Sequence, residues 1–131
     1  MNKKMLEEGS EPLIDFAKRG GFVPVIVQDV ADGRILMLAY VNQQALQATL
    51  EKGLATFWST SRNELWTKGE TSGDYLKIID IYTDCDQDAV IYRVVPQGGG
   101  ACHTKDPESG QTRASCFYRK LNLTDGSLQL V

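Results

Sequence analysis

Residues 22–40, FVPVIVQDVADGRILMLAY, hold two apolar runs on either side of a short polar break. Short apolar runs bounded by turn residues favour strands. The break contains Asp32-Gly33, a pair typical of tight hairpin turns because glycine adopts positive φ without strain. We therefore predict two strands, 22–30 and 34–40, joined as a β-hairpin.

One predicted helix lies on each side of this hairpin. Residues 11–21 carry Pro12, which suits a first helical turn, and end in two glycines suited to a left-handed cap. Residues 42–53 begin with Asn42 as N-cap and end at Gly53, with two leucines four residues apart between them. We expect both segments to be helical.

The remainder of the chain has the alternation or the short apolar runs of strands. We expect strands at 55–60, 75–83, 89–95, 115–121 and 127–131. Polar segments with glycine separate them, and the one from Pro96 to Arg113 is long for a loop without secondary structure. Long loops of this kind often carry function.

Length and charge limit the classes of protein to consider. The chain has 131 residues, of which 42% are hydrophobic, so we expect one domain over 1–131 with an ordinary core. The net charge of -3 provides no basic field for nucleic acid or an anionic membrane surface. No apolar stretch is long enough to cross a bilayer, and we expect a cytoplasmic protein without nucleic-acid or membrane partners.

Three aspartates alternate along residues 83–89, TDCDQDA: Asp84, Asp86 and Asp88. On an extended segment their side chains would share one side, while Cys85 would point the other way. Convergent carboxylates suit Mg²⁺ or Ca²⁺, and the alternative is a solvated acidic turn. An EF-hand loop is excluded because Ala89 and Val95 stand where that loop needs glycine and glutamate.

Cysteine is the second candidate metal ligand, at Cys85, Cys102 and Cys116. An odd number does not suit a fully paired disulfide framework, and the C-x-x-C spacing of structural zinc sites is missing. Three thiolates nevertheless match a catalytic zinc, which leaves its fourth position to water and lowers the pKa of that water. The alternative is that each cysteine is a small buried hydrophobic residue.

Two further features are candidates for the chemistry. His103, the sole histidine, follows Cys102 and is a metal ligand, a proton shuttle or a surface residue; we favour the shuttle because histidine titrates near neutral pH. Residues 68–73, KGETSG, combine a lysine, two glycines and two hydroxyls, which suits an anionic or phosphorylated substrate, although a simple polar turn is the alternative. The candidate substrate-binding residues are Lys68, Gly69, Glu70, Thr71, Ser72 and Gly73.

Five segments, MLAYVNQQAL, LWTKGETSG, DCDQDA, GGACHT and SCFYR, occur in this order and together resemble the phosphoribosyl-AMP cyclohydrolase family of histidine biosynthesis. The resemblance implies hydrolysis of 1-(5-phosphoribosyl)-AMP. This reaction opens the adenine ring between N1 and C6 and gives the phosphoribosyl formimino carboxamide ribotide. The substrate is thus a small-molecule nucleotide.

The resemblance also implies two metal sites in each subunit. One zinc is bound by Cys85, Cys102 and Cys116, and one magnesium is bound by Asp84, Asp86 and Asp88, while His103 manages protons. It implies an intertwined homodimer whose zinc site takes cysteines from both subunits. The expected fold is α+β, with a mixed, mainly antiparallel sheet that forms a partial barrel flanked by two helices.

The chain departs from the family pattern at two places. The segment HTKDPESGQTRA, residues 103–114, makes the span between the last two cysteines longer than is usual in the family. Asp74 stands where the family commonly has histidine or asparagine.

Two other functions remain as alternatives. A zinc nucleobase deaminase needs H-x-E and P-C-x-x-C motifs, but His103 is followed by Thr104 and Lys105, and no two cysteines are close in sequence. A zinc-stabilised, non-catalytic binding module would unfold on removal of its metal, whereas an enzyme would lose activity while remaining largely folded.

Overall fold

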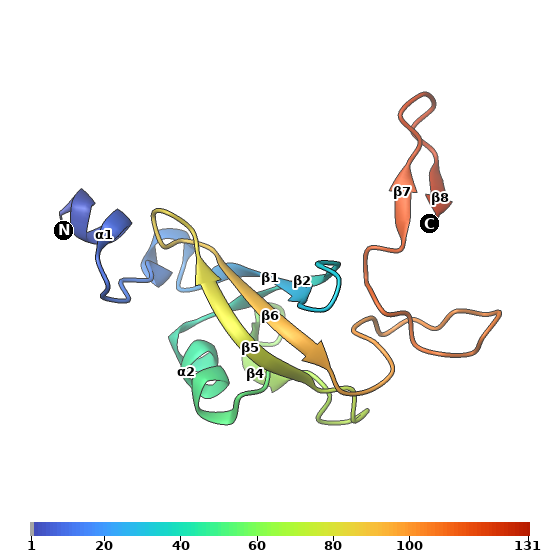
Figure 1. Cartoon of the computed structure of the whole chain (residues 1–131), viewed down its shortest axis with the longest axis horizontal. Helices are drawn as coiled ribbons and strands as arrows, with labels where there is room; N and C mark the ends of the chain where they lie inside the picture. Colours follow the sequence, from blue (N-terminus) through green and yellow to red (C-terminus); the bar gives the residue numbers. More distant parts are fainter. Residues whose placement is uncertain (1) are drawn as a thin grey trace.

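A computed structural model describes residues 2–131 as an α+β protein (Figure 1). Its elements are α1 (Lys3–Glu8), the 3-10 helix η1 (Phe16–Arg19), β1 (Val23–Asp29), β2 (Ile35–Val41), α2 (Gln43–Lys52), β3 (Thr56–Ser59), β4 (Glu64–Thr67), β5 (Leu76–Thr83), β6 (Val90–Pro96), β7 (Arg119–Leu121) and β8 (Leu128–Leu130). The main sheet has the order β2-β1-β6-β5, and only β1 and β6 are parallel. The predicted α+β class with a mixed, mainly antiparallel sheet is confirmed.

The predicted hairpin is the pair β1 and β2. Val23 lies opposite Val41, and the turn between the strands contains Gly33 at φ 78°. The Gly33 amide donates to the Asp29 carbonyl at 2.9 Å, and the Arg34 amide donates to the Asp32 side chain at 2.9 Å. The Asp-Gly pair therefore closes this turn, as its sequence indicated.

The predicted helix 42–53 is α2. The Asn42 side chain accepts a hydrogen bond from the Ala45 amide at 2.8 Å, and Gly53 ends the helix in the left-handed conformation at φ 70°. Both ends thus have the caps that the sequence predicted. Figure 1 shows α2 lying beside the main sheet, and its buried residues Ala45 and Thr49 join the core.

The predicted helix 11–21 is wrong. Only η1 forms in this segment, and a helix that was not predicted, α1, precedes it. The Leu13 amide donates to the Gln87 side chain at 2.6 Å, and the Asp15 amide donates to the Gln87 carbonyl at 2.9 Å. These amides bond to a residue distant in sequence, so a regular helix does not form through them.

The C-terminal part is less regular than predicted. Of the predicted strand 115–121 only β7 forms, because the Cys116 amide donates to the Leu36 carbonyl at 2.7 Å and ties this segment to the start of β2. The strands β3 and β4 form a separate hairpin, of which β4 was not predicted, and β7 pairs with β8. The other expected strands are present as β3, β5, β6 and β8.

The sheet within residues 2–131 is open, so the predicted partial barrel is not confirmed. The core lies on one face of this sheet and includes Val23, Val25 and Val27 of β1 together with Phe57 and Tyr92. In the described part of the chain, no helix combines the length and the apolar character needed to cross a membrane.

Candidate active site

The three aspartates converge in the turn between β5 and β6. One carboxylate oxygen from each of Asp84, Asp86 and Asp88 lies within 4.8 Å of the others. The expected cause, alternation along an extended strand, is wrong, because residues 84–89 form a turn in which Gln87 adopts φ 54°. Asp84 Oδ1 accepts hydrogen bonds from the amides of Asp88 and Ala89, at 3.0 and 3.2 Å, and so stabilises this turn.

Two basic residues of η1 contact this acidic turn. Lys18 Nζ lies 2.6 Å from Asp88 Oδ2 and 3.5 Å from Asp86 Oδ2, and Arg19 Nη2 lies 3.4 Å from Asp88 Oδ2. The hydrogen bond from Lys18 is the main cause that lowers the pKa of Asp88 to about 2. Desolvation and the neighbouring Asp88 raise the pKa of Asp84.

The acidic turn has the donor set of a divalent cation site. Its oxygen ligands are of the kind that Mg²⁺ and Ca²⁺ prefer. Asp88 is buried, and the Lys18 ammonium already supplies positive charge at this position. The three aspartates therefore fit a bound cation.

Two of the three cysteines form a pair. Cys102 is buried and Cys116 is exposed, and each affects the ionisation of the other. Desolvation raises the pKa of Cys102. The hydrogen bonds from Thr104, together with Cys116 and Arg113, lower it by more, so the net shift of the Cys102 pKa is downward. Desolvation, with the negative charge of Cys102, raises the pKa of Cys116 to about 11. The pKa values of the two thiols are therefore shifted in opposite directions.

Thr104 contacts the Cys102 sulfur, and Arg113 contacts Thr104. Thr104 Oγ1 lies 2.9 Å from Cys102 Sγ, and Arg113 Nη1 donates to Thr104 Oγ1 at 3.2 Å. The backbone between them is ordered as a small hairpin, with an isolated bridge between Lys105 and Thr112. The long segment between Cys102 and Cys116 is thus folded back on itself, and it places the positive charge of Arg113 near Cys102.

Cys85 lies apart from this pair. It is exposed in the turn before β6, whereas Cys102 follows the opposite end of that strand. β6 has seven residues, and a strand of that length spans roughly 23 Å. Figure 1 shows the β5–β6 turn beside the N-terminal segment and the segment after β6 on the other side of the molecule. One described chain therefore does not assemble all three thiols.

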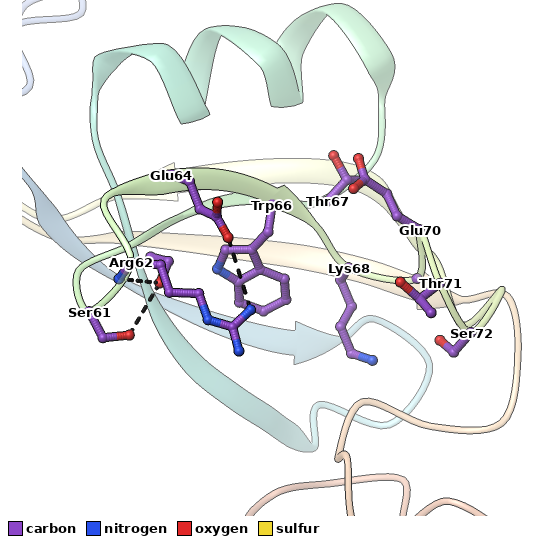
Figure 2. A pocket seen from close by; sticks show the side chains of 11 residues that line it. Ser61, Arg62, Glu64, Trp66, Thr67, Lys68, Glu70, Thr71 and Ser72 are labelled. Atoms are coloured by element: carbon purple, nitrogen blue, oxygen red, sulfur yellow. Dashed lines mark hydrogen bonds and ion pairs between the residues drawn. The ribbon is translucent and has the colours of Figure 1, made fainter.

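A pocket of about 500 Å³ lies beside the β3–β4 hairpin. Five of the six predicted substrate-binding residues line it, Lys68, Gly69, Glu70, Thr71 and Ser72, whereas Gly73 is not among them. Figure 2 shows Arg62, Trp66 and Lys68 around the same hollow. Arg62 Nη1 lies 3.9 Å from Glu64 Oε1, and its side chain is largely exposed. The pocket is therefore polar, and its lining carries two positive charges, on Arg62 and Lys68, and two carboxylates, on Glu64 and Glu70.

The pocket and the cysteine pair are neighbours. The positive charge of Lys68 acts on the Cys116 thiol and partly offsets the rise in its pKa. Asp74, just after the KGETSG segment, accepts a hydrogen bond from the Gly99 amide at 2.7 Å. The substrate-loop candidate is therefore tied to the glycine-rich segment that leads to Cys102, and His103 is exposed on the same segment.

Several residues of the site were not predicted from sequence. Lys18 and Arg19 contact the aspartates from a segment that looked like an ordinary helix, and no local signal identifies such a pairing. Arg62 and Trp66 line the pocket because β3 and β4 form a hairpin next to residues 68–73. Because both residues lie a few positions before KGETSG in the sequence, they could have been predicted as neighbours of that segment.

Comparison with known proteins identifies the family of this chain. The family model for phosphoribosyl-AMP cyclohydrolase matches residues 37–118. The phosphoribosyl-AMP cyclohydrolase of Solibacter usitatus is 50% identical over 109 residues, which cover 83% of this chain and 81% of that protein. The one from Mesorhizobium japonicum is 50% identical over 133 residues, covering 99% and 80%, and the one from Chlorobium chlorochromatii is 46% identical over 125 residues, covering 94% and 85%. The chain belongs to the phosphoribosyl-AMP cyclohydrolase family.

Proposed function

We propose that this chain hydrolyses 1-(5-phosphoribosyl)-AMP in histidine biosynthesis. Water adds at C6 of the adenine ring and the bond between N1 and C6 breaks, which gives the phosphoribosyl formimino carboxamide ribotide. Membership of the phosphoribosyl-AMP cyclohydrolase family, over most of the chain, is the observation that carries this proposal.

The pocket beside β3 and β4 is the proposed substrate site. Arg62 and Lys68 provide positive charge for the phosphates, and the Thr71 and Ser72 hydroxyls provide hydrogen bonds. Gly69 allows the loop backbone to approach the nucleotide closely. Exposed His103, next to Cys102, is the proposed group that moves protons during ring opening.

Two metal ions complete the proposal. Asp84, Asp86 and Asp88 would hold one magnesium ion, and this ion would neutralise or orient phosphate in the pocket of a second copy, because within one chain the acidic turn lies at the opposite end of β6 from the Cys102 segment. Cys85, Cys102 and Cys116 would hold one zinc ion, whose chemistry is to make water available as a nucleophile at neutral pH. Since one chain brings together only Cys102 and Cys116, the third thiol would come from a second copy.

The C-terminal hairpin supports such a homodimer. Residues 117–131 contain no buried residue, and Leu121, Leu128 and Leu130 of the hairpin are all exposed. A two-stranded hairpin is marginally stable alone and gains stability when an apolar face is covered. A second copy of the chain is the proposed cover.

Activity is the direct test. Purified protein with zinc and magnesium should remove the absorbance of N1-alkylated adenine when phosphoribosyl-AMP is added. Asp86→Asn should raise the magnesium concentration for half-maximal rate by at least about tenfold, since a ligand is lost. The exposed Glu51→Gln change, on α2, is the control for loss of one carboxylate and should leave this requirement unchanged.

Three results would contradict the proposal or a part of it. A folded, metal-loaded protein without turnover would favour the zinc-stabilised binding module. Release of ammonia from adenine nucleosides without ring opening would favour the nucleobase deaminase. An unchanged magnesium requirement in Asp86→Asn would remove the aspartates from the metal assignment.

A further inference from the structure

We propose that Lys18 is a built-in competitor for the cation at the acidic turn, and that it weakens divalent metal binding there. This inference rests on the proposed metal role of Asp84, Asp86 and Asp88. It adds a residue outside the family match, which begins at residue 37.

The position of the ammonium carries the argument. Lys18 Nζ contacts Asp88 Oδ2 at 2.6 Å and Asp86 Oδ2 at 3.5 Å, so it is shared by two of the three carboxylates. A divalent ion bound to the same oxygens would stand within a few ångströms of this charge. Two positive charges at such a distance repel each other, and the side chain of Asp88 is only 9% exposed, so screening by water is reduced. Metal binding therefore requires Lys18 to leave.

The backbone around Lys18 does not need to move for this exchange. The Lys18 amide donates to Asp15 Oδ1 at 3.0 Å, and the Asp15 amide donates to the Gln87 carbonyl at 2.9 Å. The Gln87 side chain also donates to the Leu6 carbonyl at 3.0 Å. The N-terminal segment is thus fastened to the same turn that carries the aspartates. Because the Lys18 side chain is 43% exposed, it can swing into water and later return.

Arg19 provides an internal comparison. Its guanidinium contacts only Asp88, at the longer distance of 3.4 Å, and its side chain is 54% exposed. Its charge is therefore better screened than that of Lys18. Removing Arg19 should affect the bound metal less than removing Lys18.

The test measures Mn²⁺ binding by the paramagnetic resonance signal of free Mn²⁺, without substrate. Lys18→Met should bind Mn²⁺ roughly fivefold more tightly than the unchanged protein, consistent with loss of a partly screened charge pair. Arg19→Met should show a smaller gain. The exposed Lys52→Met change, at the end of α2 and near the start of β5, removes the same charge away from the turn and should leave the affinity unchanged. Circular dichroism of each variant confirms the fold. Lys18→Gln is a second replacement that removes the charge but keeps a polar side chain.

Equal or weaker Mn²⁺ binding by both Lys18 variants would overturn the inference. The same holds if Asp86→Asn fails to reduce Mn²⁺ binding, because the ion would then lie elsewhere. Failure of the proposed function is a separate result, since it appears as absent ring opening and does not depend on Mn²⁺ affinity.

Discussion

Tyr92 shows how a single polar residue is accommodated in the core. It is fully buried in β6, and its hydroxyl donates to Thr49 Oγ1 of α2 at 3.1 Å. Thr49 Oγ1 also accepts from the Thr56 amide at 3.0 Å and lies 2.8 Å from the Ala45 carbonyl oxygen. This network joins the sheet, α2 and the β3–β4 hairpin through satisfied polar groups.

The same burial predicts a pH dependence. Desolvation raises the pKa of Tyr92 to about 12, whereas an unfolded tyrosine titrates near about 10. The folded state therefore keeps the proton that the unfolded state loses, and this stabilisation, complete below pH about 10, is lost as pH rises towards about 12. Tyr92→Phe should lower the free energy of unfolding at pH 7 by about 1 kcal/mol, yet show a shallower alkaline decline.

Urea unfolding at neutral and alkaline pH measures both effects. Tyr40→Phe, at a partly exposed tyrosine, is the control and should keep the alkaline decline of the unchanged protein. Parallel pH curves for Tyr92→Phe and the unchanged protein would contradict the assignment of the decline to Tyr92.

At the scale of elements, the loop between β4 and β5 depends on two glycines with different surroundings. Gly69 has φ 97°, and a Cβ there would collide with the backbone of Asp74 and Tyr75. Gly73 has φ 80°, but a Cβ there would meet open space. Positive φ disfavours alanine at both positions, while only Gly69 adds a steric clash.

Gly69→Ala should therefore destabilise the protein more than Gly73→Ala. We expect a loss of about 1 kcal/mol for Gly73→Ala from its positive φ, and roughly 1–3 kcal/mol more for Gly69→Ala from the clash. Because Gly69 lines the pocket, its variant should also raise KM for the nucleotide. Thermal unfolding and initial rates measure the two effects. Equal costs at both glycines would show that the loop relaxes around the added carbon.

At the scale of the whole molecule, the placement of the three cysteines bears on whether the proposed zinc site is shared by two copies of the chain. Cys102 and Cys116 meet within one chain, and Cys85 stands at the opposite end of β6. A site shared by two copies predicts that inactive Cys85→Ser and inactive Cys102→Ser chains complement each other. About half of the reassorted dimers are mixed, and each mixed dimer has one intact site, so about a quarter of the activity should return.

Co-refolding of the two variants with zinc, beside each variant refolded alone, measures this recovery. Zinc analysis of the separate variants should show loss of bound metal in Cys85→Ser, Cys102→Ser and Cys116→Ser. Native mass spectrometry confirms that mixed dimers are present. Every chain in the mixture carries one lesion, so a site within one chain would give no activity. Mixed dimers without activity would therefore exclude the shared site.

The sequence by itself determined the features that depend on neighbouring residues. The turn at Asp32-Gly33 and the ends of α2 at Asn42 and Gly53 were predicted because caps and tight turns are set by contacts a few residues apart. The family, the KGETSG loop and the acidic cluster were also apparent from short motifs in a fixed order.

Only the tertiary structure decided which distant residues meet. The amides of Leu13 and Asp15 donate to Gln87 instead of continuing a helix, and Lys18 contacts Asp88 across a separation of 70 residues. The carboxylates converge through a turn, not through strand alternation, and the sheet places Cys85 away from Cys102. Local patterns carry no information on such contacts, since their energy depends on how the sheet brings the segments together.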